Sequence, residues 1–230
     1  YGLRSGIWRI FDIFDKYNVK ATFSCCSLAL ENSPWLIDEI LIRNHEISAH
    51  GVKWISYAYL SKEEEKQIIN DCYSSILKLS GHPPVGWHTK SSTSPFTRDL
   101  LIEHGGFTYD SNAYNDDIPY VLKKNDQKLV IIPYSFDTND MRYDGNNGFV
   151  RGDDFNIYCK ESFNQLLSET DDGSLRMMSI GLHPRIIGRP GRIKGLEDFI
   201  KYIKTYENVW IPKRMDIAQY CLEKDSFNLF

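Results

Sequence analysis

The chain has 230 residues, of which 42% are hydrophobic and 25% charged, and its formal net charge is −4. This length suits one α/β barrel or one large core and is too short for two ordinary domains with a linker, so we predict a single domain over residues 1–230. The charge excludes a basic surface for nucleic acid or an anionic membrane, and no apolar run approaches the roughly 18 residues that span a bilayer.

Short β-branched or aromatic runs alternate with amphipathic stretches along the whole chain. The predicted strands, in chain order, cover residues 21–25, 46–49, 85–88, 107–110, 129–133, 177–182 and 208–211. The predicted helices, in chain order, cover residues 3–17, 34–43, 62–79, 97–104, 154–167, 196–206 and 214–222. The helix over 62–79 begins with a capping box, Ser61-x-x-Glu64. The region 143–153, rich in Gly, Asn and Asp, is predicted to be a loop.

Alternation of strand and helix favours a parallel sheet, and seven such units favour a closed or nearly closed barrel. The predicted fold class is therefore α/β, a distorted (β/α)7-type barrel. Because the chain begins with a helix, the strand that normally precedes the first helix of a barrel has no counterpart in it. The opening residues also run straight into an amphipathic pattern, so we expect no secretory leader. The five scattered cysteines form no C-x-x-C pair, and we expect reduced thiols in a cytoplasmic protein.

Histidine and aspartate follow several of the predicted strands. His50, His88, Asp110 and His183 stand at strand ends, and Asp137 and Asp140 come shortly after the strand over 129–133. The carboxyl ends of parallel strands converge on one rim in such folds, so these side chains are expected to meet. An imidazole beside a carboxylate is a usable general acid and base near neutral pH. His88 has a second reading, in which it only caps a strand end.

Other kinds of site find less support in the sequence. The residue four after His50 is Trp54, which cannot bind a metal, although ligands for zinc could still converge from distant loops. There is no Gly-x-Ser-x-Gly nucleophile motif and no glycine-rich phosphate loop. The segment 188–192, with Arg189 and Arg192, is either a turn before a helix or a loop whose arginines hold a carboxylate or a polar amide.

Several segments together resemble the polysaccharide deacetylase superfamily. They are Ala21-Thr22-Phe23, Glu46-Ile47-Ser48-Ala49-His50-Gly51, Pro84-Val85-Gly86-Trp87, Gly106-Phe107-Thr108-Tyr109-Asp110-Ser111 and Ile180-Gly181-Leu182-His183-Pro184. The segments 51–57, 116–120, 133–142 and 188–190 are similar to the atypical branch of metal-independent allantoinases and related peptidoglycan deacetylases. The resemblance spans nearly the whole chain. It implies a distorted (β/α) barrel that hydrolyses a C–N amide bond other than a peptide bond.

The resemblance also implies roles for individual residues. His50 matches the first metal histidine of metal-dependent members, and Trp54 stands where those members have the second, so the match favours no obligatory metal. His183 matches a late histidine that acts as general acid, and Asp137 and Asp140 match an acidic stretch of the atypical branch. The expected substrate-binding residues are Trp54, Trp87, Lys90, Asp110 and Arg189.

Two features depart from the family pattern. The opening strand with its acidic motif has no counterpart in this chain, and the loop after Trp87 has His88-Thr89-Lys90-Ser91-Ser92 where an allantoinase-like loop has a Gly-Arg pair. Lys90 could supply the missing positive charge, but without the fork of a guanidinium.

The resulting hypothesis is attack of water on an amide carbonyl, with His183 protonating the departing nitrogen. Asp137, Asp140 or His50 would take the proton of the water, and Lys90, Arg189 or the backbone near His50 would stabilise the oxyanion. Expected partners are a small amide or an N-acetylated sugar, with no nucleic acid and no membrane, and the resemblance implies a homotetramer. No cofactor is expected. Two alternatives stay open: an inactive remnant that binds a ligand or partner, and a zinc-dependent deacetylase of N-acetylated polysaccharides.

Overall fold

The computed structural model describes residues 1–90, 93–124, 126–145, 148–171 and 173–224. The chain forms two compact units, each built from two separate stretches of sequence. Unit 1 consists of Tyr1–Val19 and Tyr134–Ile211, and unit 2 consists of Lys20–Pro133 and Pro212–Phe230. The single domain over residues 1–230 stays a prediction. Ser91 and Ser92 of the loop after Trp87, and Asn146 and Asn147 of the loop predicted over 143–153, lie outside the described residues.

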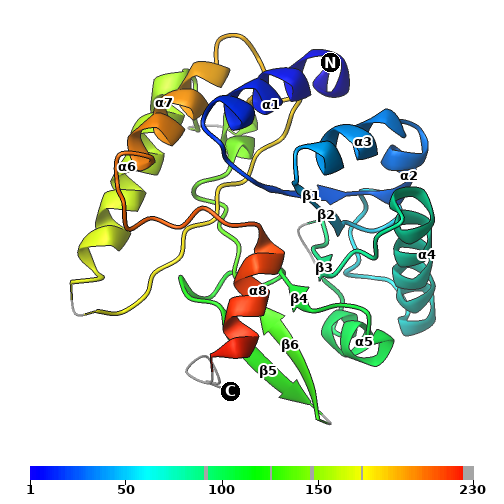
Figure 1. Ribbon diagram of the computed structural model, residues 1–230. Coiled ribbons are helices and arrows are strands. Elements are labelled where there is room, and N and C mark those ends of the chain that lie inside the picture. The colour runs from blue at the N-terminus through cyan, green and yellow to red at the C-terminus, as the bar shows by residue number, and fades with distance from the viewer. Residues whose placement is uncertain (91–92, 125, 146–147, 172, 225–230) are drawn as a thin grey trace. The chain divides into compact units, whose positions relative to one another are not determined.

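Unit 2 is built on a six-stranded sheet with the strand order β1-β2-β3-β4-β6-β5. The strands are β1 (Thr22–Cys25), β2 (Glu46–Ala49), β3 (Gly86–Trp87), β4 (Tyr109–Asp110), β5 (Tyr120–Lys124) and β6 (Gln127–Ile131). Neighbouring strands run parallel, except that β5 pairs antiparallel with β6 to form a hairpin (Figure 1).

The carboxyl ends of the strands in unit 2 are aligned across the sheet. Three successive pairings set this alignment: Ala49 with Trp87, Trp87 with Asp110, and Asp110 with Ile131. The ladder continues one residue further, because the backbone N–H of His50 donates to Cys25 O (2.9 Å) and that of His88 donates to Ala49 O (3.1 Å). His50 and His88 therefore leave neighbouring strands at the same edge of the sheet.

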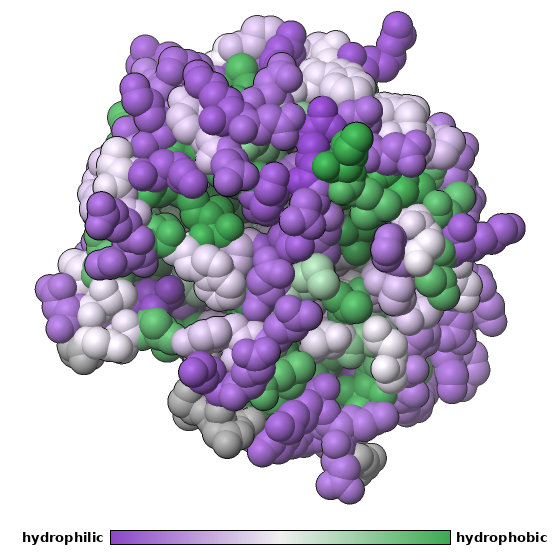
Figure 2. Space-filling model, in the orientation of Figure 1, coloured by the Kyte–Doolittle hydropathy of each residue, from purple (hydrophilic) through white to green (hydrophobic). Residues whose placement is uncertain are grey.

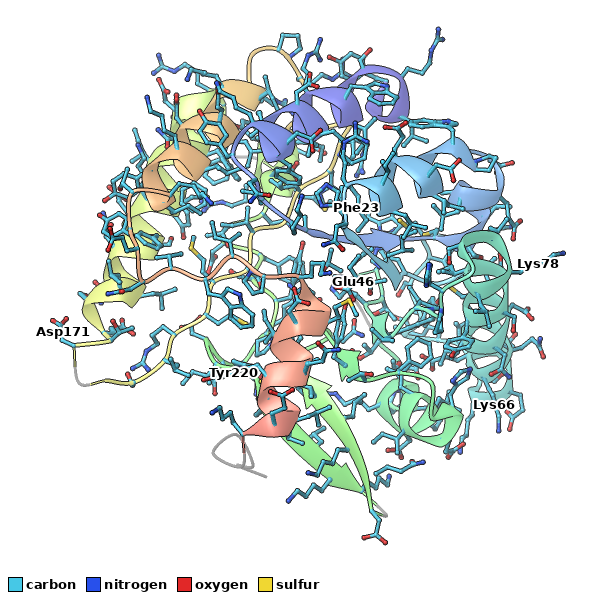
Figure 3. The ribbon with its side chains drawn as sticks, viewed as in Figure 1. Phe23, Glu46, Lys66, Lys78, Asp171 and Tyr220 are labelled. Atoms are coloured by element: carbon cyan, nitrogen blue, oxygen red, sulfur yellow. The ribbon has the colours of Figure 1, made fainter. Side chains whose placement is uncertain are left out.

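The helices among the described residues of unit 2 are α2 (Ser27–Glu31), α3 (Trp35–Ile42), α4 (Lys62–Ser80), α5 (Thr97–His104) and α8 (Arg214–Glu223). The capping box of α4 is present, since Ser61 Oγ accepts from the N–H of Glu64 and the Glu64 carboxylate accepts from the N–H of Ser61. Lys66 and Lys78 of α4 point away from the sheet (Figure 3), and the surface over α4 is largely hydrophilic (Figure 2). α8 lies beside the hairpin of β5 and β6 (Figure 1).

Glu46, the first residue of β2, connects the sheet to the start of α8. Its carboxylate is buried and accepts hydrogen bonds from Thr22 Oγ1 (2.6 Å), Tyr109 OH (2.8 Å) and the backbone N–H of Met215 (3.0 Å). Figure 3 shows Glu46 near the first turn of α8. Burial raises the pKa of Glu46, although these hydrogen bonds and the charge of Arg214 act in the opposite direction.

Unit 1 is mainly helical. Its elements are the π-helix η1 (Gly2–Gly6), α1 (Ile7–Lys16), the 3₁₀-helix η2 (Asp140–Asp144), α6 (Gly152–Ser168) and α7 (Ile193–Ile203). α6 and α7 lie side by side (Figure 1), and they approach closely because a Cβ on Gly195 would lie 2.1 Å from Gly152 O. A parallel β-bridge between Asn139 and Gly181 links the two segments that carry the candidate residues of this unit.

The structure corrects two of the predicted strands and adds two elements that were not predicted. The apolar run over 177–182 is extended but, among the described residues, pairs only at Gly181, so it is not a strand. The run over 208–211 also has no strand partner in the described part of the chain, and α2 and the hairpin strand β5 were not predicted. In each corrected case local composition suited a strand, whereas pairing depends on a neighbour that composition does not specify.

All five cysteines are free thiols, and Cys72, Cys159 and Cys221 are buried. Burial raises the pKa of Cys26 to about 11 and that of Cys72 to about 12. Among the residues that the structure describes, no helix combines the length and the apolar character that a membrane crossing requires.

Candidate active site

His183 and Asp140 form the closest acid–base pair of the predicted residues, and both belong to unit 1. The Nδ1 atom of His183 lies 2.6 Å from Asp140 Oδ1. Asp140 is wholly buried, whereas the side chain of His183 is 22% exposed. The imidazole thus has one edge against a buried carboxylate and another that solvent can reach.

Asp140 also organises the turn that follows His183. Its second oxygen, Oδ2, accepts from the backbone N–H of His183 (2.6 Å) and from that of Ile187 (3.1 Å). The turn closes on itself through the N–H of Ile186, which donates to His183 O (2.8 Å). One carboxylate therefore binds the ring, the backbone of the same residue and the far side of its turn.

The local sequence explains how these two residues meet. Asp140 N–H donates to Gly181 O (2.9 Å), Gly181 N–H donates to Thr138 O (3.1 Å), and Thr138 Oγ1 donates to Ser179 O. These contacts hold Asp140 and His183 side by side, although in the described part of the chain only Asn139 and Gly181 form a bridge. A Cβ on Gly181 would lie 2.2 Å from Tyr134 OH and 2.5 Å from Asn139 Nδ2, so a larger residue would have to displace these side chains.

The geometry suits proton transfer. Because Asp140 accepts from Nδ1, the neutral ring of His183 carries its lone pair on Nε2, and the protonated ring carries an N–H there. A carboxylate on Nδ1 fixes the tautomer and the orientation of the ring. His183 can therefore give or take a proton at Nε2.

Asp137 and Arg189 lie in the same unit but make different contacts. The side chain of Asp137 is exposed, while its backbone carbonyl accepts from Arg142 Nη1 (3.1 Å). The guanidinium carbon of Arg189 lies 3.8 Å from the centre of the Tyr1 ring. Asp137 can be reached by water, and the guanidinium of Arg189 lies over an aromatic ring.

In unit 2 the structure brings His50 and His88 together at the edge of the sheet. The rings stack with their centres 5.2 Å apart, and His50 Nδ1 lies 2.5 Å from the backbone oxygen of His88. A carbonyl oxygen only accepts, so Nδ1 of His50 carries the proton and the lone pair of the neutral ring is on Nε2. The predicted meeting of His50 with His183 stays a prediction, because the two residues belong to different units.

Asp110 is wholly buried, and it supports the edge of the sheet from within. Arg98 Nε donates to its carboxylate (3.0 Å), and the backbone N–H of Asn112 donates to the other oxygen (2.9 Å). Burial raises the pKa of Asp110, while the charge of Arg98 lowers it. With both oxygens occupied, Asp110 orders its loop, and its predicted role in direct substrate binding finds no support in these contacts.

The two predicted tryptophans differ in position. Trp54 is 40% exposed, and the ammonium nitrogen of Lys90 lies 4.3 Å from the centre of its ring. Trp87 is 0% exposed, and its ring packs against Tyr57 and Phe107. Trp87 is therefore a core residue, and its burial gives no support to the substrate-binding role predicted for it, whereas Trp54 and Lys90 form a pair that a ligand could reach.

Comparison with known proteins assigns the chain to a family. The model of the polysaccharide deacetylase family matches residues 1–101. A Schizosaccharomyces pombe protein named as a polysaccharide deacetylase is 35% identical over 235 residues, which cover 95% of this chain and 73% of that protein. The chain belongs to the polysaccharide deacetylase family. The peptidoglycan deacetylase of Helicobacter pylori is 25% identical over 239 residues, covering 90% of this chain and 80% of that one.

Solved structures place the fold in the same family. A polysaccharide deacetylase from Pseudomonas aeruginosa PAO1 and PuuE allantoinase each share 38% identity with a TM-score of 0.94, over 99% of this chain and 76% of theirs. A Mycobacterium smegmatis structure shares 27% identity with a TM-score of 0.88, over 97% of this chain and 79% of its own. The predicted family and the α/β barrel-like fold class are confirmed, as is the class of enzyme, a deacetylase-type hydrolase of C–N bonds.

Two residues of this deacetylase-family chain escaped the sequence reasoning. Arg214, at the start of α8, donates from Nη1 to Ser111 Oγ (3.0 Å) and to Ile132 O (3.3 Å) at the edge of the sheet. Tyr114 OH lies 3.4 Å from Nε2 of His88. No sequence motif marks either residue. Arg214 in particular contacts Ser111 from a part of the chain about a hundred residues further on.

The side chains that usually bind metal ions are not clustered in the described part of the chain. Among the described residues, no three or more His, Cys, Asp or Glu side chains are grouped so that they could hold a metal ion. Trp54 stands four residues after His50, and Nδ1 of His50 is directed at a backbone oxygen. That the enzyme needs no metal stays a prediction.

Proposed function

We propose that this polysaccharide deacetylase family member hydrolyses a small amide or an N-acetylated sugar, with His183 as general acid and Asp140 as its positioning residue. One observation supports this most directly: the 2.6 Å contact between His183 Nδ1 and the buried Asp140 carboxylate. The names of two relatives, a peptidoglycan deacetylase and an allantoinase, agree with an amide as the bond that is cleaved.

In the proposed reaction, a water oxygen forms a bond to the amide carbonyl carbon as the water proton passes to a base. The C–N bond then breaks, and the Nε2–H of protonated His183 transfers its proton to the departing nitrogen. The products are a carboxylate and an amine. Asp140 already accepts three N–H groups, so it is a poor base for the water, and the exposed Asp137 of the same unit is our candidate. The role of His50 as an alternative base stays a prediction.

A substrate panel tests the proposal. N-acetylglucosamine oligomers, allantoin and simple primary amides are incubated with the full chain, and release of acetate, ureido acid or ammonia is followed. Turnover of any of them in the wild type, and its loss in His183→Ala, is the expected result. His82→Ala is the matched control, because His82 is an exposed histidine of unit 2. Turnover that survives in His183→Ala would refute the assignment, and no turnover at all would favour an inactive remnant that only binds a ligand.

The metal question needs a separate arm. The active enzyme is dialysed against a chelator and assayed before and after addition of zinc. Unchanged turnover supports the metal-independent reaction. Loss with chelator and recovery with zinc would instead support the zinc-dependent alternative.

A further inference from the structure

A second group of side chains in unit 1 takes no part in the proton transfers of the proposed reaction, although the sequence predicted one of them, Arg189, to bind substrate. The segment 185–192 carries three arginines, Arg185, Arg189 and Arg192, that line a groove of about 520 Å³ together with Asp144, Val150 and Gly191. We call this the arginine groove. We infer that it binds a small oxyanion ligand, one that carries carboxylate or phosphoryl groups.

The charge of the groove favours an anion. Three guanidinium groups face one carboxylate, Asp144, so the lining carries an excess of two positive charges. Among the described residues, neither Arg189 nor Arg192 has an acidic partner within 4.0 Å. α7 begins at Ile193, directly after Arg192, so the positive end of its dipole adds to the same potential. The volume lies within the range typical of small-molecule sites, roughly 300–1,000 Å³.

Two of the three guanidinium groups are held in place before any ligand arrives. The guanidinium carbon of Arg189 lies 3.8 Å from the centre of the Tyr1 ring, and that of Arg192 lies 4.4 Å from the centre of the Tyr143 ring. Stacking uses the face of a guanidinium and leaves its edge N–H groups for hydrogen bonds. In Arg189 the Nε–H already donates to Arg185 O (3.3 Å), so the edge that is left for a ligand is the one formed by its Nη groups. Such edges bind carboxylate and phosphate oxygens in pairs, and a fork that is already oriented loses less entropy on binding.

The turn beneath the groove is itself rigid. Arg9 Nη1 donates to Gly188 O (2.7 Å), and a Cβ on Gly6 would lie 1.9 Å from Pro184 O, so η1 packs directly on the turn. On the other side, Asp140 accepts from the N–H of Ile187. The arginines therefore project from a fixed backbone and not from a mobile loop.

The floor of the groove offers a substitution that changes charge with little strain. A Cβ on Gly191 would meet no atom within 4 Å. Gly191→Asp therefore places a negative charge in the groove, and Gly191→Asn places a side chain of the same size without charge. This pair separates electrostatics from volume.

Direct binding to the full chain tests the inference without reference to turnover. Inorganic phosphate and citrate are titrated by calorimetry, with sodium chloride at equal ionic strength as the reference. We expect binding of at least one anion, weakened roughly tenfold or more in Arg189→Gln/Arg192→Gln. The matched control is Arg4→Gln/Lys201→Gln, which removes two exposed charges of unit 1 outside the groove and should leave affinity within about twofold.

The outcomes are distinct. Binding of phosphate alone identifies a phosphoryl ligand, and binding of citrate alone identifies a carboxylate ligand. If anion binding is lost in Gly191→Asp but kept in Gly191→Asn, the anion binds in the arginine groove. Absence of binding to both anions overturns the inference, as does an equal loss in the control double variant, because net charge would then explain the binding. Failure of His183→Ala to affect turnover would leave these results unchanged.

Discussion

Replacement of Asp140 by alanine tests how much one buried carboxylate contributes to unit 1. Asp140 accepts from His183 Nδ1, from the N–H of His183 and from the N–H of Ile187. Hydrogen bonds to a charged group contribute about 1.5–3 kcal/mol each, and a buried donor left unpaired costs about 1–3 kcal/mol. Ile187 is wholly buried, but water can reach His183 in the variant. We therefore expect Asp140→Ala to lower the free energy of unfolding by about 3–5 kcal/mol.

Two further variants make this prediction specific. Asp140→Asn keeps one acceptor oxygen and should lose about 1–2 kcal/mol, because it can still accept from part of the turn. Asp137→Ala removes an exposed carboxylate of the same segment, and its effect on stability should stay within about 0.5 kcal/mol.

The assay is urea unfolding at pH 7, followed by far-ultraviolet circular dichroism, with the midpoint and slope fitted for each variant. If Asp140→Ala unfolds at the same urea concentration as Asp137→Ala, the three hydrogen bonds do not stabilise the turn. The assignment of Asp140 as positioning residue would then lose its physical basis. A stable Asp140→Asn that has lost on the order of a thousandfold in turnover would, in contrast, support that role.

Three other expectations concern unit 2. Burial raises the pKa of Glu46 above its ordinary value of 4.5, so its contribution to stability is largest below pH 4.5 and falls as the pH rises above it. In urea titrations the wild type should therefore lose stability relative to Glu46→Gln as the pH is raised from 4.5, and a constant difference would contradict this. Ser61→Ala removes the cap of α4 and should lower the free energy of unfolding by about 1 kcal/mol in the same assay. An unchanged free energy of unfolding would contradict a stabilising role of the capping box. In Gly86→Ala the new Cβ would lie 1.9 Å from the Tyr109 ring, whereas in the control Gly191→Ala it would meet no atom within 4 Å. The melting temperature of Gly86→Ala should therefore be well below that of Gly191→Ala, and equal melting temperatures would contradict this packing.

Local sequence predicted the parallel strands and most of the helices, for identifiable reasons. The strand predicted over 46–49 coincides with β2, and the helix predicted over 97–104 coincides with α5. In both cases apolar or β-branched periodicity ends at a clear boundary, such as His50-Gly51 or Gly105. The run over 177–182 has the same composition as a strand, but only Gly181 finds a partner among the described residues.

The candidate site was predictable in part. Strand-end reasoning placed His183 near Asp140 and His50 near His88, since the direction of parallel strands alone brings such residues together. It could not show that Trp87 points into the core, because the face that a strand residue occupies depends on the whole sheet. It also missed Arg214, whose contacts with Ser111 and Ile132 depend on how a distant helix docks.

The discontinuous make-up of unit 2 has a consequence for the newly made protein. Its second stretch, Pro212–Phe230, is the last part of this sequence to leave the ribosome, yet α8 supplies the N–H of Met215 to Glu46 and the guanidinium of Arg214 to the sheet edge. Until then Glu46 in the nascent sheet lacks the backbone donor Met215, and Ser111 at the sheet edge lacks the guanidinium of Arg214. Completion of this edge therefore waits for the synthesis of residues 214 and 215, which delays any chemistry there until these residues have left the ribosome.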